Sequence, residues 1–242
     1  RVTTLDRANR MVRLAPLTGP SYAELNWLLT SLFAVRPSTT STTKKRRKKS
    51  TADDTTDLLT LDSTYEYLAG VQAVQAQYKL SINAAAALIG QLKYQGEENG
   101  TPLLFSLFGS SVPDQNKWDS TATTGTDAQT SSTIAKALGL SAADLQSLVA
   151  YMGGSYGQKV TQIDLSAQNS IFLSGLYRAA LYCQLRSISV DNLLYLLQAL
   201  DNDFLALPTD LSVVWADFQA LESFVDQLSE AGISVDTFEE MS

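Results

Sequence analysis

Histidine is absent from this chain of 242 residues, and its absence restricts the chemistry that the remaining side chains can do. Most general-base, triad and metal-ligand arrangements depend on an imidazole, so catalysis here would need carboxylates or lysine. Asp201 and Asp203 follow a helical segment and resemble the start of a cation-binding loop. The glycine and the distal glutamate of a calcium loop do not follow them, and we therefore interpret both residues as capping or solvated groups.

Three further features could carry chemistry, and each has a simpler structural interpretation. The glycine-rich run Gly153 to Gly157 lacks the Lys-Ser/Thr ending of a phosphate loop, which favours a flexible connector. Arg178 lies within an apolar stripe, where a buried ion pair or a snorkelling side chain is expected. Cys183 is the only cysteine, which rules out an internal disulfide, and its apolar neighbours predict a core position.

These observations predict a chain without catalytic, cofactor-binding or metal-binding residues. We expect that the protein is not an enzyme and that it needs no cofactor. A carboxylate-dependent enzyme is the least favoured of the alternatives, because the absence of histidine leaves only carboxylates or lysine for catalysis.

The net charge of −7 combines two regions of opposite sign. Six of the 18 basic residues form the run Lys44 to Lys49, and the rest of the chain has 12 basic against 25 acidic residues. Phosphate binding needs a broad basic face, so the acidic body argues against nucleic acid as a partner. Serine and threonine flank the run, which predicts a solvated loop, and a nuclear-import or anion-binding patch is the alternative.

The apolar residues make up 45% of the chain, which is enough for a folded core. None of their runs approaches the roughly 18 residues of a membrane-spanning helix, so we expect no membrane insertion by this fragment. The chain starts at Arg1 without an initiator methionine or a signal peptide. We therefore expect an excised piece of a longer protein, from whose own residues the localisation cannot be read.

The elements that must position these residues are helices, and they recur in one pattern. A helix leads into a tight turn that ends in serine, and a second helix follows. Between Ile171 and Leu200 the apolar residues return at intervals of three and four, which is the period of an α-helix. Units whose apolar stripes cannot be buried alone are typical of stacked helical repeats or of a large bundle. Five serines hold the equivalent place: Ser21, Ser81, Ser141, Ser189 and Ser234.

Each of these serines is predicted to cap the helix that follows it. The hydroxyl can accept a backbone N–H of the first turn, and Glu24 and Asp144 stand three residues on, as in a capping box. Apolar residues before four serines and five positions later have the spacing of a hydrophobic staple: Leu80 with Ala85, Leu140 with Leu145, Ile188 with Leu193, and Ile233 with Phe238. Three glycines can close the preceding helix in the left-handed conformation: Gly19, Gly139 and Gly232.

The predicted fold class is all-α, an array of helical hairpins packed as an irregular bundle or solenoid. We expect residues 1–242 to form a single α-helical region with two polar insertions, a basic, disordered one at about 34–60 and a loop at about 109–129. The expected helices are Leu5 to Leu17, Tyr22 to Phe33, Ser63 to Tyr78, Ile82 to Leu92, a short helix after Pro102, Ser131 to Leu138, Ala142 to Met152, Ser166 to Arg186, Val190 to Leu200, Leu211 to Ala231, and Val235 to the end.

At these turns the sequence resembles the A subunits of the insecticidal toxin complexes, or Tc toxins, and their virulence-plasmid relatives. The resemblance is clearest from Leu176 to Leu200, where a Leu-Tyr-Arg helix leads through Ser-Val-Asp into a leucine-rich helix. The units around Ser21, Ser141 and Ser234 and the PLLFSLFGS segment at Pro102 are similar to further parts of the same family. The resemblance covers most of the chain apart from the two insertions, and the basic, threonine-rich loop departs from the family's pattern.

The resemblance implies a secreted or cell-surface-associated toxin subunit that assembles as a pentamer. In such subunits an α-helical shell with inserted receptor-binding domains surrounds a translocation channel, which delivers a toxic enzyme that partner subunits carry. This chain resembles shell rather than channel, because it lacks long apolar stretches. The implied partners are other subunits of a toxin complex, further copies of the same subunit and a host-surface receptor. The alternative is an intracellular helical-repeat adaptor with a basic nuclear-import or anion-binding loop.

Overall fold

The computed structural model describes residues 20–22, 24–25, 28–29, 62–92, 103–108, 127–156, 167–206 and 211–241. Within these ranges the regular secondary structure is helical and contains no strand, which confirms the predicted all-α class. Residues 22, 24, 25, 28 and 29 are helical. The helices that follow are α3 (Asp62–Tyr78), α4 (Ile82–Leu88), α5 (Leu103–Phe108), α6 (Asp127–Leu138), α7 (Ala142–Tyr156), α8 (Ala167–Arg186), α9 (Val190–Ala199), α10 (Leu211–Glu230) and α11 (Val235–Met241).

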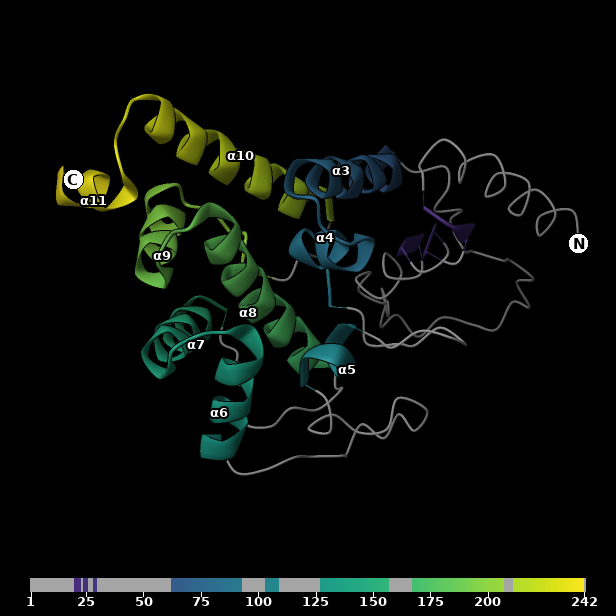
Figure 1. Cartoon of the computed structure of the whole chain (residues 1–242), viewed down its shortest axis with the longest axis horizontal. Coiled ribbons are helices and arrows are strands. Elements are labelled where there is room, and N and C mark those ends of the chain that lie inside the picture. The colour runs from purple at the N-terminus through teal and green to yellow at the C-terminus, as the bar shows by residue number, and fades with distance from the viewer. Residues whose placement is uncertain are drawn as a thin grey trace, which may run out of the picture.

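Helix α8 forms the centre of the molecule. Figure 1 shows it crossing the middle of the fold, and it packs against α4, α6, α7 and α9. Its residues 172–180 are all buried, so this part of the helix is surrounded on every side rather than along one stripe. The run of alanines in α4 lies against it, and Ala85, Ala86 and Ala87 are fully buried, as small residues at a close helix contact should be.

The hairpins form an array that closes back on itself. The second helices of three successive hairpins pack in order, α7 against α9 and α9 against α11. Helix α10, however, packs against α3, which lies far earlier in the sequence and at the same side of the molecule in Figure 1. A solenoid repeat contacts only its neighbours, so this contact between distant repeats makes the array an irregular bundle.

Aromatic side chains fill the core where α8, α10 and the segment after α9 meet. Tyr182 contacts Phe204 edge to face, with ring centroids 5.6 Å apart, and Phe218 at 6.2 Å. Trp215 stacks on Phe218 at 5.7 Å with an interplanar angle of 19°. Such ring pairs add to the stabilisation that burial of the aromatic surface provides.

Most helix boundaries agree with the sequence pattern, and those of α4, α6 and α7 differ clearly from it. Helix α4 ends at Leu88 rather than at Leu92, and residues 89–92 are not helical and form hydrogen bonds with side chains of α8. Helix α6 begins at Asp127, so the loop predicted for residues 109–129 is wrong at 127–129. The first turn of α6 is entirely polar or small, and apolar periodicity could not reveal it.

The predicted flexible connector at Gly153 to Gly157 is also wrong as far as the structure describes it. Helix α7 continues through Gly153, Gly154 and Ser155 to Tyr156. Glycine in a helix costs only about 1 kcal/mol relative to alanine, and α7 is anchored just before this point by Met152, which is buried. Gly157, Gly19, the expected helix Leu5 to Leu17 and the insertion at 34–60 lie outside the described residues.

Candidate functional site: the capped turns and the polar junction

All five serines cap their helices as predicted. Ser141 forms a reciprocal capping box, because its Oγ accepts the N–H of Asp144 at 3.0 Å and the Asp144 carboxylate accepts the N–H of Ser141 at 3.2 Å. Ser21 and Glu24 form the same pair at 3.3 and 2.8 Å. The other three serines accept an N–H from the residue three positions on: Ala84 to Ser81 at 3.3 Å, Asn192 to Ser189 at 3.1 Å, and Thr237 to Ser234 at 3.1 Å.

The preceding helices end with one common backbone conformation. The residue two positions before the serine has a positive φ in four turns: Lys79 (55°), Gly139 (67°), Ser187 (54°) and Gly232 (71°). The predictions for Gly139 and Gly232 are confirmed. Lys79 and Ser187 were not identified from the sequence, because neither residue type indicates this conformation.

Backbone hydrogen bonds show that these ends are Schellman motifs. The N–H of Ile188 donates to the carbonyl oxygen of Cys183 at 3.1 Å, and the N–H of Ile233 donates to that of Leu228 at 2.9 Å. Ile188 and Ile233 are also the predicted staple residues, and both pack against the core. The N–H of Leu140 donates to the carbonyl oxygen of Ala135 in the same way. The turns before Ser141, Ser189 and Ser234 are therefore fixed on both sides, by a closed helix end and by a serine cap.

A polar cluster joins three of the helices beside the aromatic core. We name it the polar junction, and its members are Gln77 and Tyr78 of α3, Tyr182 and Arg186 of α8, and Glu222 and Asp226 of α10. Glu222 is only 7% exposed, and its Oε2 accepts hydrogen bonds from Gln77 Nε2 at 2.9 Å and from the Tyr78 hydroxyl. Arg186 places its Nε 3.7 Å from Glu222 Oε1 and also donates to the Asp226 carboxylate.

The electrostatics of the polar junction favour fixed protonation states. Burial, followed by the hydrogen bond and charge of Glu222, raises the pKa of Tyr78, and burial and Glu222 likewise raise the pKa of Tyr182. Burial by itself would lower the pKa of Arg186, but the hydrogen bond to Asp226 and the charge of Glu222 outweigh it and raise that pKa. Both tyrosines therefore stay neutral and the guanidinium stays charged near neutral pH. This arrangement fastens α3, α8 and α10 together rather than activating a base or a nucleophile.

Arg178 forms a second internal fastening. It is fully buried, so the snorkelling interpretation is wrong, and its Nη2 donates to the carbonyl oxygens of Leu205 at 3.2 Å and Ala206 at 2.7 Å. Its Nη1 donates to the carbonyl oxygen of Gly90 at 3.3 Å. One side chain of α8 thus binds the segments that follow α4 and α9. Its guanidinium carbon also lies 5.9 Å from the centre of the Phe204 ring.

The remaining candidates from the sequence have structural positions. Asp201 has a φ of 48° and its N–H donates to the Gln198 carbonyl oxygen, so it closes the end of α9. Asp203 is exposed, and its charge is the second cause, after burial, of the raised pKa of Asp217. Cys183 is buried, as predicted, and burial raises the pKa of its thiol to about 12. In the described part of the chain, no three acidic or sulfur side chains gather into a cluster that could hold a metal ion.

Two grooves flank the polar junction, and Asp226 lines both of them. The first, of about 560 Å³, lies between α3 and α10, and we name it the α3–α10 groove. The second, of about 540 Å³, lies between the serine turns at Ser189 and Ser234. The part of the chain that the structure describes has no helix long and apolar enough to cross a membrane.

Comparison with solved structures identifies the fold as one like that of a Tc toxin A subunit, in agreement with the resemblance of the sequence. A cryo-EM structure of Yersinia pseudotuberculosis TcaA-TcaB matches 96% of this chain with a TM-score of 0.65 and 19% sequence identity. A cryo-EM structure of Morganella morganii TcdA4 matches 74% of it with a TM-score of 0.53 and 16% identity. The matches cover 11% and 8% of those chains, so this chain spans about a tenth of their length. No protein-family model and no curated protein matches it.

Proposed function

We propose that this chain is a segment of the α-helical shell of a Tc-toxin-like A subunit, where it serves assembly, host-surface attachment and delivery of a toxic partner subunit. The observation that carries the proposal is the fold match over 96% of the chain at a TM-score of 0.65. The order of the capped hairpins supports it, because the sequence at these same turns resembles that family. On this proposal the protein is secreted or associated with the cell surface and has no enzymatic activity of its own.

The buried polar contacts of Arg178 and Glu222 support the assignment to a shell. Arg178 and Glu222 each bring together segments far apart in the sequence, Arg178 with Gly90 and Leu205, and Glu222 with Tyr78. Buried charged groups that are hydrogen-bonded or ion-paired favour one packing arrangement over others, since another arrangement would leave them unpaired. A wall around a channel needs such a fixed shape, whereas an adaptor that adjusts to many partners does not.

The mass of the complete gene product in solution tests the proposal. We expect mass photometry to show a large homo-oligomer, a pentamer by the resemblance, and we expect it to bind other subunits of a toxin complex. Antibody fragments raised against the 242-residue chain should bind the intact assembly, because a shell lies on the outside. A product that stays monomeric at micromolar concentration, or an assembly that these antibody fragments do not bind, would contradict the shell assignment.

The run from Lys44 to Lys49 supports a second candidate, an intracellular helical-repeat adaptor that uses its basic segment for nuclear import or anion binding. The run lies outside the described residues, so limited proteolysis is the suitable test. Rapid trypsin cleavage there, with the helical body left intact, is the expected result for a loop with no bound partner. Protection that appears only when an import receptor or an anionic partner is added would favour the adaptor.

A further inference from the structure

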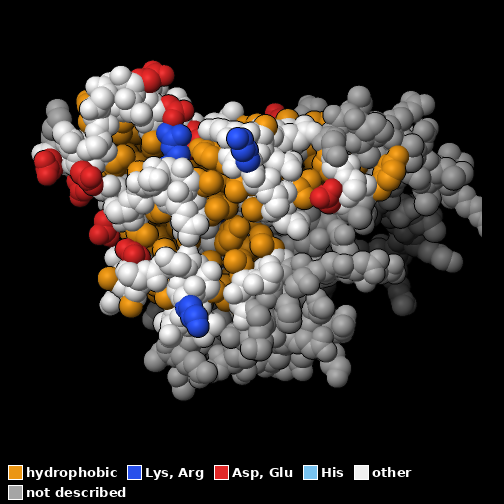
Figure 2. All heavy atoms as spheres, viewed as in Figure 1, with side chains coloured by type: hydrophobic (Ala, Val, Ile, Leu, Met, Phe, Trp, Pro, Cys, Tyr) orange, Lys and Arg blue, Asp and Glu red, His pale blue; other side chains and the backbone are white. Residues whose placement is uncertain are grey.

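We draw no further inference here: the strongest candidate, the acidic surface that Figure 2 shows over the end of the molecule formed by α10 and α11, is a cluster of carboxylates in which Asp226 already pairs with Arg186 and Asp236 with Asn192, and no second feature among the described residues points to a ligand there.

Discussion

Asn192 Nδ2 donates a hydrogen bond to Asp236 Oδ1 at 2.7 Å, and this contact links the first turns of α9 and α11. The backbone N–H of Asn192 also donates to Ser189 Oγ, so one residue completes the cap of its own helix and holds the next hairpin. The Asp236 carboxylate lies in the first turn of α11, where the partial positive charge of the helix favours it. Successive capped turns are therefore coupled directly.

A double-mutant cycle measures this coupling. Asn192→Ala and Asp236→Ala should each lower the free energy of unfolding, and the pair should lower it by about 1 kcal/mol less than the sum. Asp191→Ala is the matched control, because Asp191 lies in the same turn and is exposed. A coupling energy near zero in urea unfolding would show that the two turns are independent.

The cap and the core position of one hairpin should differ in their effect on stability. Ser189→Ala should cost about 1 kcal/mol through the lost cap. Leu193→Ala should cost roughly 2–5 kcal/mol, because Leu193 is fully buried. Urea unfolding of both variants decides the order. If Leu193→Ala is nearly neutral, the register of the α8–α9 hairpin is wrong.

The left-handed turn residues predict two opposite effects. Gly232→Ala should cost about 1 kcal/mol through backbone strain alone, since a Cβ atom there would meet no other atom within 4 Å. Ser187→Gly, at a φ of 54°, should instead stabilise the protein by about 0.5–1 kcal/mol. Thermal unfolding of both variants checks the signs. Destabilisation by Ser187→Gly would mean that its side chain, and not its backbone, determines that turn.

The local features of the fold could be predicted from the sequence, because their causes lie within a few residues. The serine caps, the capping box at Asp144 and the closing glycines Gly139 and Gly232 each depend on a residue type at a fixed spacing, and the structure contains them. Lys79 and Ser187 take the same conformation as the glycines only because the rest of the turn imposes it. No residue type marked those two positions.

The polar junction could not be predicted, because its members come from helices far apart in the chain. Glu222 and Tyr78 are separated by 144 positions, and each looks like an ordinary surface residue in its own helix. The buried position of Arg178 could be anticipated from its apolar neighbours, but its carbonyl partners could not. Those partners exist because the segments that follow α4 and α9 are not helical and leave carbonyl groups within reach of Arg178.

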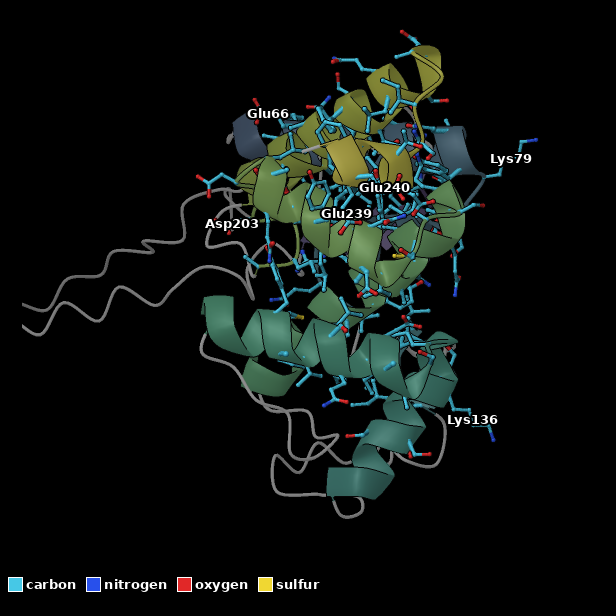
Figure 3. The ribbon with its side chains drawn as sticks, turned by 90° about the vertical axis from the view of Figure 1, so that its left-hand side faces the viewer. Glu66, Lys79, Lys136, Asp203, Glu239 and Glu240 are labelled. Atoms are coloured by element: carbon cyan, nitrogen blue, oxygen red, sulfur yellow. The ribbon has the colours of Figure 1, made fainter. Side chains whose placement is uncertain are left out.

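Removal of the Arg178 guanidinium should destabilise the fold strongly. Arg178→Met keeps most of the apolar volume but leaves the carbonyl groups of Gly90, Leu205 and Ala206 without this donor. A loss of about 3 kcal/mol or more is expected in urea unfolding. Lys136→Met is the control, because Figure 3 shows Lys136 pointing away from the body, and it should stay within about 0.5 kcal/mol. Equal effects of the two substitutions would contradict the role of Arg178.

A cryo-EM map of the complete gene product tests the central claim most directly. We predict that residues 62–241 form capped helical hairpins in the outer wall of an oligomeric assembly, with α10 packed on α3 and the serine turns in the order described. A map that places this segment along a central channel, or that shows no shell around a channel, would contradict the assignment.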